Sequence, residues 1–316
     1  MSRIIFVPQY PTPNRYQEWW MWKIPEEFRK AGFEVITLGE KYVDMIVHRR
    51  GNPAWFAPVN IAVEFETEQI REYCTLSFKP DDILFLADIS FLGIFCSALY
   101  HYRPSKMYAF CHATSLNKLD YFESVRHSKF PVESAHAGMF DKVFVGSKYH
   151  QDKLGWKNTV VTYLPFPPLP SYKNTKEYDI VSASRPTPQK VDSELEREVE
   201  AEFSRIVRRD TRTWEDYFKF LSQSTVLLIS SHEDTFGYQI VDAIMNGCIP
   251  LAPNRCSYPE LLQREYLYND REELFKMIDD SLWGFLSVPK LKCEAQMNNF
   301  YKKIIKEMTQ EVDYPF

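Results

Sequence analysis

Glycine is scarce in this chain, with 10 glycines among 316 residues, and no G-x-G-x-x-G fingerprint of a dinucleotide-binding loop occurs. The 6 cysteines show no C-x-x-C spacing, and several lie in apolar runs, which favours buried free thiols over a zinc site or disulfides. No apolar run reaches the roughly 18 residues that a membrane-spanning helix needs. Residues Met1 to Pro8 predict a short strand instead of a signal peptide. We therefore expect a cytoplasmic protein that makes no use of a membrane.

The chain also lacks an excess of positive charge, since its formal net charge is -5. This balance argues against a generally basic nucleic-acid binder, although it leaves room for a local basic groove. With 316 residues, 45% of them hydrophobic, the chain is long enough for two domains with separate cores. Four prolines within residues 165–170 fit neither a helix nor a central strand. The sequence therefore predicts an N-terminal domain (1–164), a hinge (165–170) and a C-terminal domain (171–290).

The most informative stretch is Val226 to Leu262. It begins with the apolar run Val226–Ile229, which is short enough for a buried strand, and continues through a polar loop to the pair Phe236–Gly237. An amphipathic segment follows and stops at Gly247, where a helix would need its C-terminal glycine, before a second apolar strand over residues 248–252. In such a strand–loop–helix–strand unit, a ligand lies beyond the carboxyl end of the strand and faces the N-terminus of the helix. The unpaired amides at that end favour an anion.

Two carboxylates accompany this predicted anion site. Asp234 lies in the loop, Asp242 lies about one turn into the helix, and Gly237 stands between them. Ionised carboxylates only accept hydrogen bonds, so a pair of them suits a ligand that presents hydroxyl groups. A sugar nucleotide combines an anion with several hydroxyls, and the pattern therefore predicts such a ligand.

At these residues the sequence resembles the C-terminal domain of retaining GT-B glycosyltransferases of family 4. That family carries two carboxylates separated by seven residues around a Phe-Gly pair, and the match extends to Asn246–Gly247 and to Ser257–Leu261. The family usually has two glutamates where this chain has Asp234 and Asp242, so each reach is one methylene shorter and the identities of sugar and nucleotide stay open. The resemblance implies an α/β fold with two Rossmann-like lobes facing across a cleft, and a final segment (291–316) whose helix crosses back to the N-terminal lobe.

The resemblance also implies a retaining transfer from a nucleotide sugar, most commonly a UDP-sugar, with no metal or other cofactor required. Asp234 would contact the donor sugar, Asp242 the ribose, and His112, at the end of a strand over 106–110, the sugar from the other lobe. The donor-binding residues that it implies are Arg185, Lys190, Asp234, Phe236, Gly237, Asp242 and Glu260, and the catalytic set is His112, Asp234, Arg185 and Lys190.

Arg185 and Lys190 lie five residues apart in a loop that follows a predicted strand over 178–184. A leaving nucleoside diphosphate gains negative charge as the glycosidic bond breaks, so two fixed cations would stabilise the transition state. The span from Lys190 to Val226 is short for this family, which usually places another strand and helix there. We therefore expect a trimmed C-terminal lobe, with a charged helix over 191–207 and an arginine cluster (Arg205 to Arg212) near its end.

The N-terminal half begins with a strand–loop–helix–strand pattern over residues 4–38, which fits a Rossmann-like domain. Its helix carries Trp19, Trp20 and Trp22, which fit either helix packing or an aromatic platform for an acceptor.

Residues 248–261 look closest to glycosyltransferases that modify queuosine in transfer RNA. The compact size, with aromatics among local basic residues, is similar to phage enzymes that glycosylate hydroxymethylated bases in DNA. The favoured acceptor is therefore a hydroxyl on a modified nucleobase, in the host cytoplasm if the protein is phage-encoded. Such an enzyme takes the base out of its stack or meets it single-stranded. The residues expected on the acceptor side are Trp19, Trp20, Arg49, Arg50, Arg126 and Lys129. A glycan or small-molecule acceptor, or a catalytically silent sugar-nucleotide binding protein, stays an alternative, and the sequence leaves the oligomeric state open.

Overall fold

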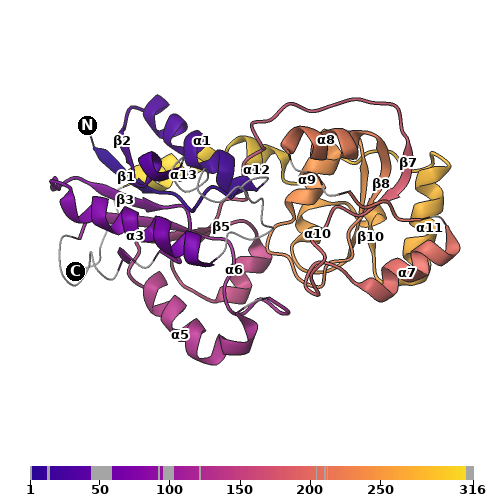
Figure 1. The fold of residues 1–316 in the computed structure, drawn as a ribbon, viewed down its shortest axis with the longest axis horizontal. Coiled ribbons are helices and arrows are strands. Elements are labelled where there is room, and N and C mark those ends of the chain that lie inside the picture. Colours follow the sequence, from indigo (N-terminus) through magenta and orange to yellow (C-terminus); the bar gives the residue numbers. More distant parts are fainter. Residues whose placement is uncertain are drawn as a thin grey trace.

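The computed structural model describes residues 2–12, 15–43, 59–91, 93–94, 103–120, 122–203, 205–209, 211 and 213–310. Within these residues the chain forms two lobes, each built on a parallel sheet (Figure 1). The sheet of the N-terminal lobe has the strand order β2-β1-β3-β4-β5-β6, and that of the C-terminal lobe has the order β10-β9-β8-β7. The predicted α/β class is confirmed.

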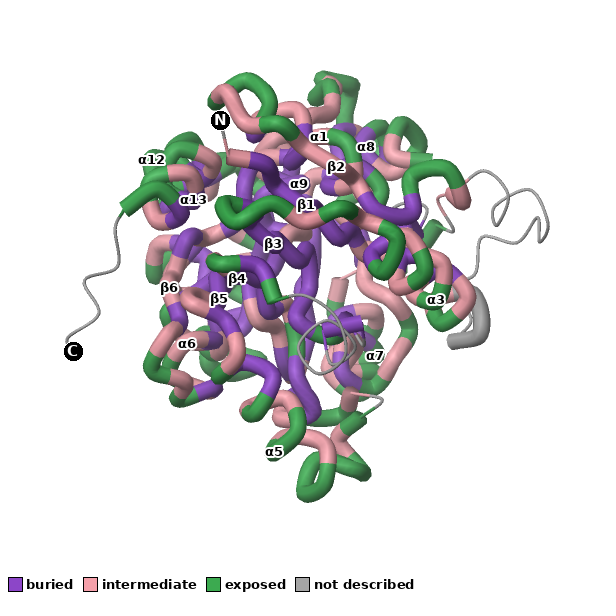
Figure 2. The backbone as a smooth tube through the Cα atoms, turned by 90° about the vertical axis from the view of Figure 1, so that its left-hand side faces the viewer, coloured by how far each residue is buried: buried purple, intermediate pink, exposed green. Residues whose placement is uncertain are grey.

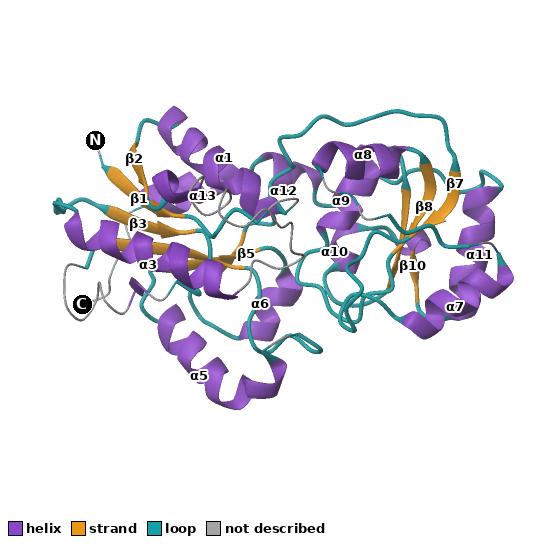
Figure 3. Ribbon diagram, viewed as in Figure 1, coloured by secondary structure: helices purple, strands orange, loops and turns teal. Residues whose placement is uncertain are grey.

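Strands and helices alternate along the N-terminal lobe, as parallel pairing requires. Its strands are β1 (Arg3–Val7), β2 (Glu34–Thr37), β3 (Ile83–Leu86), β4 (Lys106–Cys111), β5 (Lys142–Val145) and β6 (Thr159–Val161). Its helices are α1 (Tyr16–Lys30), α3 (Val59–Thr75), α5 (Arg126–Ala137) and α6 (Lys148–Leu154), with short 3-10 turns at Glu40–Tyr42 and Glu123–Val125. Helices lie on both sides of the sheet (Figure 3).

Both faces of this sheet are buried, which explains why its strands are continuous apolar runs instead of alternating ones. Along β1, Ile4 and Phe6 face the cluster that contains Trp20 of α1, whereas Ile5 and Val7 face the cluster that contains Tyr73 of α3. Figure 2 shows β1, β3, β4 and β5 as a buried centre with the helices around it. The carboxyl ends of these strands are thereby held in fixed positions at one edge of the sheet.

The C-terminal lobe repeats this arrangement on a smaller scale. Its elements are β7 (Tyr178–Val181), α7 (Ser193–Glu202), α8 (Trp214–Ser222), β8 (Ser224–Leu228), α9 (Tyr238–Met245), β9 (Ile249–Pro253), α10 (Tyr258–Leu261), a 3-10 turn (Arg264–Tyr266), β10 (Leu267–Tyr268) and α11 (Arg271–Leu282). Between α7 and α8, Val207 makes an isolated parallel bridge with Val181 at the edge of β7. The amide of Val207 donates to the carbonyl of Ile180 over 3.0 Å. The resemblance led us to expect that this lobe lacks one strand of the family. At that place the chain has the single bridging residue Val207.

Residues 162–177, all of them described, connect the two sheets without forming a helix or a strand. After α11 the chain returns through α12 (Glu294–Asn298) to α13 (Phe300–Thr309), which lies beside α1 on the N-terminal lobe (Figure 1). The Lys142 ammonium pairs with Oε2 of Glu307 over 2.6 Å, and the Tyr108 hydroxyl donates to the carbonyl of Met308 over 3.3 Å. The last described helix therefore packs on the first lobe, not on the second.

Some element boundaries differ from the sequence-based expectations. The expected helix over 191–207 spans only Ser193–Glu202. The Asp192 side chain starts it by accepting from the amides of Glu194 and Leu195, and the backbone leaves helical geometry at Phe203, with φ -107° and ψ -88°. Helices α3 and α5 and the short strand β10 were not expected. The five described cysteines are free thiols: Cys74, Cys111, Cys248, Cys256 and Cys293. Among the described residues, no helix is both long and apolar enough to cross a membrane.

Candidate functional site

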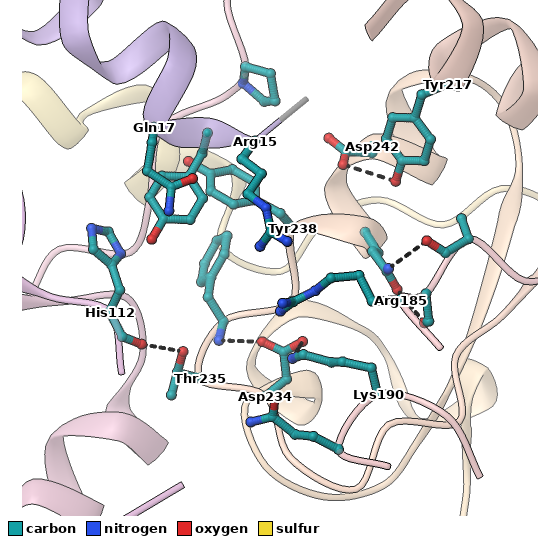
Figure 4. Close-up of a pocket in the computed structure, with 18 of the residues that line it drawn as sticks. Arg15, Gln17, His112, Arg185, Lys190, Tyr217, Asp234, Thr235, Tyr238 and Asp242 are labelled. Atoms are coloured by element: carbon teal, nitrogen blue, oxygen red, sulfur yellow. Dashed lines mark hydrogen bonds and ion pairs between the residues drawn. The ribbon is translucent and has the colours of Figure 1, made fainter. Parts of the chain in front are cut away.

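A cavity of about 570 Å³ opens between the two lobes (Figure 4). Its walls come from the start of α1, the loop after β4, the loop after β7, the segment before α8 and the loop that leads into α9. Except for the segment before α8, which follows helix α7, these walls lie at the carboxyl ends of parallel strands, the edge at which open α/β sheets bind ligands. The volume lies within the range of roughly 300–1,000 Å³ that is usual for small-molecule sites.

Lys190 and Asp234 form an ion pair at one end of the cavity, with 2.8 Å between Nζ and Oδ2. Lys190 also donates to the carbonyl of Glu233 over 3.1 Å, and the amide of Phe236 donates to Oδ1 of Asp234 over 3.2 Å. Burial alone would raise the pKa of Asp234, but Lys190, the Phe236 amide and Arg185 outweigh it and hold the pKa below its usual value. Asp234 is therefore ionised at neutral pH and accepts hydrogen bonds only.

Arg15 was not expected at this site. It precedes the first residue of α1, and its side chain and that of Arg185 extend toward each other from opposite lobes (Figure 4). Burial, and then the positive charge of Arg185, lower the pKa of Arg15 to about 10, so the group is still a cation at neutral pH. Its position at the end of the loop after β1 was the only sequence signal that could have identified it.

Gly237 precedes α9 and has a backbone conformation that other residues adopt with strain, at φ 94°. A Cβ at this position would lie 2.9 Å from Cε1 of Tyr258, closer than side chains allow. The glycine thus lets the chain turn sharply from Phe236 into the helix, and it leaves the N-terminal end of α9 at the cavity wall.

Asp242 lies one turn into α9 and is 4% exposed. The hydroxyl of Tyr217, on α8, donates to its Oδ2 over 3.2 Å, whereas Oδ1 is buried without a hydrogen-bond partner among the described residues. Burial raises the pKa of this carboxyl to about 8. Asp242 lines the same cavity as Asp234, but the two carboxyl groups have opposite pKa shifts and differ in protonation at neutral pH.

His112 lies on the side of the cavity that the N-terminal lobe forms. Its Nε2 lies 3.0 Å from the carbonyl oxygen of Ala87, which can only accept, so Nε2 carries the proton and Nδ1 is an acceptor. Burial lowers the pKa of His112 to about 4, and the ring packs against Tyr16, Trp20 and Phe110. His112 is therefore a neutral, fixed imidazole at neutral pH, and its backbone carbonyl accepts from the Thr235 hydroxyl of the other lobe over 2.7 Å.

The residues predicted for donor binding and catalysis divide into those that line the cavity and one that does not. Phe236 and Gly237 line the cavity, as do Arg185, Lys190, Asp234, Asp242 and His112. Glu260 is not among the described residues that line it, and its part in donor binding stays a prediction. Its carboxylate accepts from the backbone amides of Lys148 and Tyr149, over 2.8 and 2.7 Å, at the start of α6 in the opposite lobe. This pairing occupies both oxygens of Glu260 and ties the two lobes together.

Of the four described residues predicted for the acceptor side, Trp19 alone lines the cavity. Trp20 is 1% exposed in the core and Trp19 is 2% exposed at the cavity wall, so neither ring offers the open face that base stacking needs. Arg126 and Lys129 lie on α5 outside the cavity lining, and Lys129 pairs with Glu133. Arg49 and Arg50 lie outside the described residues. The rings are buried because Tyr238 packs against Trp19 and Phe300 of α13 packs against Trp20.

The segment before α8 contributes a second unexpected wall. Arg208 and Arg209, two members of the arginine cluster noted in the sequence, line the cavity together with Trp214. Arg208 pairs with Glu196 and Glu200, and Arg209 lies over the ring of Tyr178.

No group of three His, Cys, Asp or Glu side chains that could hold a metal ion occurs in the part of the chain that the structure describes.

Comparisons with known proteins agree with this architecture. No family model matches the chain. A tRNA-queuosine alpha-mannosyltransferase of Drosophila melanogaster is 30% identical over 114 residues, a stretch that covers 36% of this chain and 29% of that relative. Thus the matched stretch spans less than a third of the relative's length.

Among solved structures, HepE from Anabaena, in complex with UDP and glucose, matches 98% of this chain and 95% of its own, with a TM-score of 0.63 and 14% identity. The lipopolysaccharide outer core galactosyltransferase WaaB, in its apo form, covers 98% of this chain and 99% of its own, with a TM-score of 0.59 and 12% identity. Sucrose-phosphate synthase from Thermosynechococcus elongatus covers 98% and 95%, with a TM-score of 0.58 and 13% identity. The chain has the GT-B fold of these neighbours, as the sequence resemblance predicts.

Proposed function

We propose that this protein is a glycosyltransferase that moves a sugar from a nucleotide-sugar donor to a hydroxyl group. The observation that carries the proposal is the interlobe cavity in which Arg185 and Lys190 meet the N-terminal end of α9, with the ionised Asp234 beside them. Cations and helix amides bind a diphosphate, and a carboxylate accepts from sugar hydroxyls. The GT-B fold and the partial match to a queuosine-tRNA mannosyltransferase support this reading.

The transfer exchanges one bond for another at the anomeric carbon. The bond to the distal phosphate oxygen breaks, a bond to the acceptor oxygen forms, and the acceptor proton passes to the departing diphosphate on the same face of the sugar, which retains the anomeric configuration. Arg185 and Lys190 stabilise the negative charge that develops on the leaving group. Asp234 orients the sugar, and the unpaired Oδ1 of Asp242 accepts or donates at a ribose hydroxyl, according to its protonation.

His112 contributes orientation instead of proton transfer. A group with a pKa near 4 is a poor general base at neutral pH, whereas its free Nδ1 acceptor fits a sugar hydroxyl. We infer that no protein nucleophile takes part, and that no metal is required. A UDP-sugar is the donor we favour, because HepE, one of the matching GT-B structures, was solved with UDP and glucose.

The acceptor that we favour is a hydroxyl on a modified nucleobase of DNA or tRNA. The match to the tRNA-queuosine alpha-mannosyltransferase supports this choice over a glycan or a small molecule. For a nucleic acid that delivers its base into the cleft, we propose Arg126 and Lys129 on α5, outside the cavity, as phosphate contacts.

A screen for release of nucleoside diphosphate tests the proposal. UDP-, GDP- and ADP-sugars are each incubated with wild-type protein and with DNA containing hydroxymethylated bases, queuosine-containing tRNA or simple glycans. We expect release that depends on both a donor and an acceptor, and that is lost in Arg185→Ala. If no pair gives release above the Arg185→Ala background, the glycosyltransferase proposal is wrong.

A further inference from the structure

We propose that Arg15 is a third cationic ligand of the donor diphosphate, supplied by the N-terminal lobe across the cleft from Arg185 and Lys190. This inference rests on the proposed function and adds a residue to its site. The sequence pattern at Arg15 carries no motif, and the role follows from where the fold places the side chain.

The geometry brings Arg15 into the same cavity as the two cations of the C-terminal lobe. Arg15 immediately precedes α1, at the carboxyl-end edge of the first sheet, and its guanidinium group and that of Arg185 approach each other in Figure 4. Lys190 lies on the far side of Arg185 and is held by Asp234 over 2.8 Å. A diphosphate that extends from Lys190 past Arg185 would therefore lie next to Arg15.

The charges at this end of the cavity fit a diphosphate. Arg15, Arg185 and Lys190 are cations, and the ionised carboxylate of Asp234 pairs with Lys190. Burial is the main cause of the lowered pKa of Arg15, and the charge of Arg185 adds to it. Two guanidinium groups that face each other repel, and a bound anion between them would offset this repulsion. A nucleotide sugar carries one negative charge on each of its two phosphates, which Arg15 and Arg185 would face from opposite lobes.

The loop before Arg15 explains why a side chain would take this role. In many nucleotide-binding folds, a glycine-rich loop after the first strand presents backbone amides to the phosphates. Here the loop from Pro8 to Arg15 contains no glycine, and its three prolines have no amide hydrogen. The amide of Thr12 is already bonded to the carbonyl of Tyr10 over 2.8 Å. A backbone cradle is thus poorly available, and a guanidinium group stands at the end of the same loop.

Contact between Arg15 and the leaving diphosphate would affect kcat more than KM. The leaving diphosphate gains negative charge in the transition state, so a cation that contacts it stabilises that state more than the bound donor. Removing Arg15 should therefore lower kcat by a larger factor than it raises KM. Because Arg15 and Arg185 belong to different lobes, the diphosphate would also link the two lobes while the donor is bound.

The test measures binding of inorganic pyrophosphate and of UDP by calorimetry, for wild type, Arg15→Ala, Arg15→Lys, Arg185→Ala and Arg29→Ala. Arg29 is exposed in the last turn of the same helix, so Arg29→Ala makes the same charge change away from the cavity. Circular dichroism and thermal melting check that each variant is folded, and Arg15→Lys keeps a cation if the alanine variant is unstable. The same variants are then assayed for nucleoside diphosphate release with and without guanidinium ion, which can occupy the space that Arg15→Ala vacates.

We expect Arg15→Ala to weaken pyrophosphate and UDP binding by roughly tenfold and Arg29→Ala to leave both unchanged. Arg15→Lys should fall between them, and guanidinium ion should restore part of kcat in Arg15→Ala only. Wild-type affinity in Arg15→Ala, combined with lost affinity in Arg185→Ala, would overturn the role of Arg15 and leave the proposed function intact. Absence of pyrophosphate and UDP binding by the wild-type protein would overturn both.

Discussion

Nζ of Lys190 and Oδ2 of Asp234 lie 2.8 Å apart, with side chains that are 16% and 20% exposed. Removing either partner of such a shielded pair leaves a charge with less solvent to stabilise it. The pair also keeps a cation and a hydrogen-bond acceptor beside the N-terminal end of α9. A diphosphate that attracts Lys190 would leave Asp234 free to accept from the donor sugar, so the ion pair prepares both groups for one ligand.

Lys190→Ala should therefore reduce transfer strongly without unfolding the protein. We expect kcat/KM to fall by roughly 10²–10³-fold, the range found when one preorganised transition-state donor is lost. Lys157→Ala, which removes an exposed lysine away from the cavity, is the matched control and should retain wild-type kinetics. Steady-state rates with a saturating acceptor provide the measurement, and near wild-type turnover in Lys190→Ala would remove Lys190 from the site.

Asp234→Asn tests the carboxylate separately. An asparagine keeps the shape of the side chain but loses the charge that pairs with Lys190 and one of the acceptor oxygens that a sugar would use. We expect a loss of activity of at least roughly tenfold, whereas Asp179→Asn, an exposed position on β7, should be neutral. Equal activities of the two variants would argue against contact between Asp234 and the donor.

Asp242 makes stability depend on pH in a specific direction. Its pKa is raised from 3.8 to about 8 in the folded state, so between these values the folded protein holds a proton that the unfolded chain has released. The free energy of unfolding must then decrease as pH rises through this window, by up to about 1.4 kcal/mol per pH unit, and level off above about pH 8.

Asp242→Asn removes this titration while an amide can still face the Tyr217 hydroxyl. Melting temperatures of the ligand-free wild type and of Asp242→Asn, measured from about pH 5 to about pH 9, should diverge in favour of the variant as pH rises. Parallel curves over the whole range would show that Asp242 is not a buried, protonated carboxyl.

Glu260→Ala should affect the connection between lobes more than donor binding. The change leaves the amides of Lys148 and Tyr149 at the start of α6 without their partner, which we expect to cost about 1–2 kcal/mol of stability. The affinity for UDP should stay within about twofold of wild type, since Glu260 does not lie among the described residues of the cavity wall. Calorimetric UDP titration and thermal melting check both expectations, and a large loss of affinity with unchanged melting would restore Glu260 to the donor site.

A nucleic-acid acceptor would make binding sensitive to salt. Each phosphate neutralised by a basic side chain releases counterions, so the affinity for a substrate oligonucleotide should fall steeply between about 50 and 200 mM salt. Arg126→Ala, which removes an exposed cation on α5, should reduce the slope of this dependence. A flat salt response would favour a small-molecule or glycan acceptor instead.

The local part of the site was readable from the sequence because it lies within one strand–loop–helix unit. The spacing of Asp234, Gly237 and Asp242 fixes their places relative to the end of β8 and the start of α9, so the structure brings them to one cavity wall. Arg185 and Lys190 follow a strand that pairs directly with β8, and parallel pairing puts their loop at the same edge. The GT-B fold followed from the same residues through the family resemblance.

What the sequence did not reveal depends on how the lobes face each other. Arg15 meets Arg185 only because the carboxyl-end edges of the two sheets converge, and no local pattern encodes that approach. Glu260 accepts from the amide of Tyr149 at the start of helix α6, a residue 111 positions away in sequence. Trp20 is covered by Phe300 of α13, a contact between the two ends of the chain. In each case the deciding interaction joins segments that are distant in sequence.

The most direct test of glycosyl transfer is mass spectrometry of nucleosides released from an acceptor after incubation with the protein and a nucleotide sugar. DNA containing hydroxymethylated bases and queuosine-containing tRNA are each tested with UDP-, GDP- and ADP-sugars, with Lys190→Ala as the inactive control. The proposal predicts a nucleoside heavier by one sugar residue, formed by the wild-type protein and not by Lys190→Ala, with the anomeric configuration of the donor retained. Sugar transfer at equal rates by both proteins would contradict the assignment of the site, and no transfer to any acceptor together with no nucleoside diphosphate release would contradict the glycosyltransferase function itself.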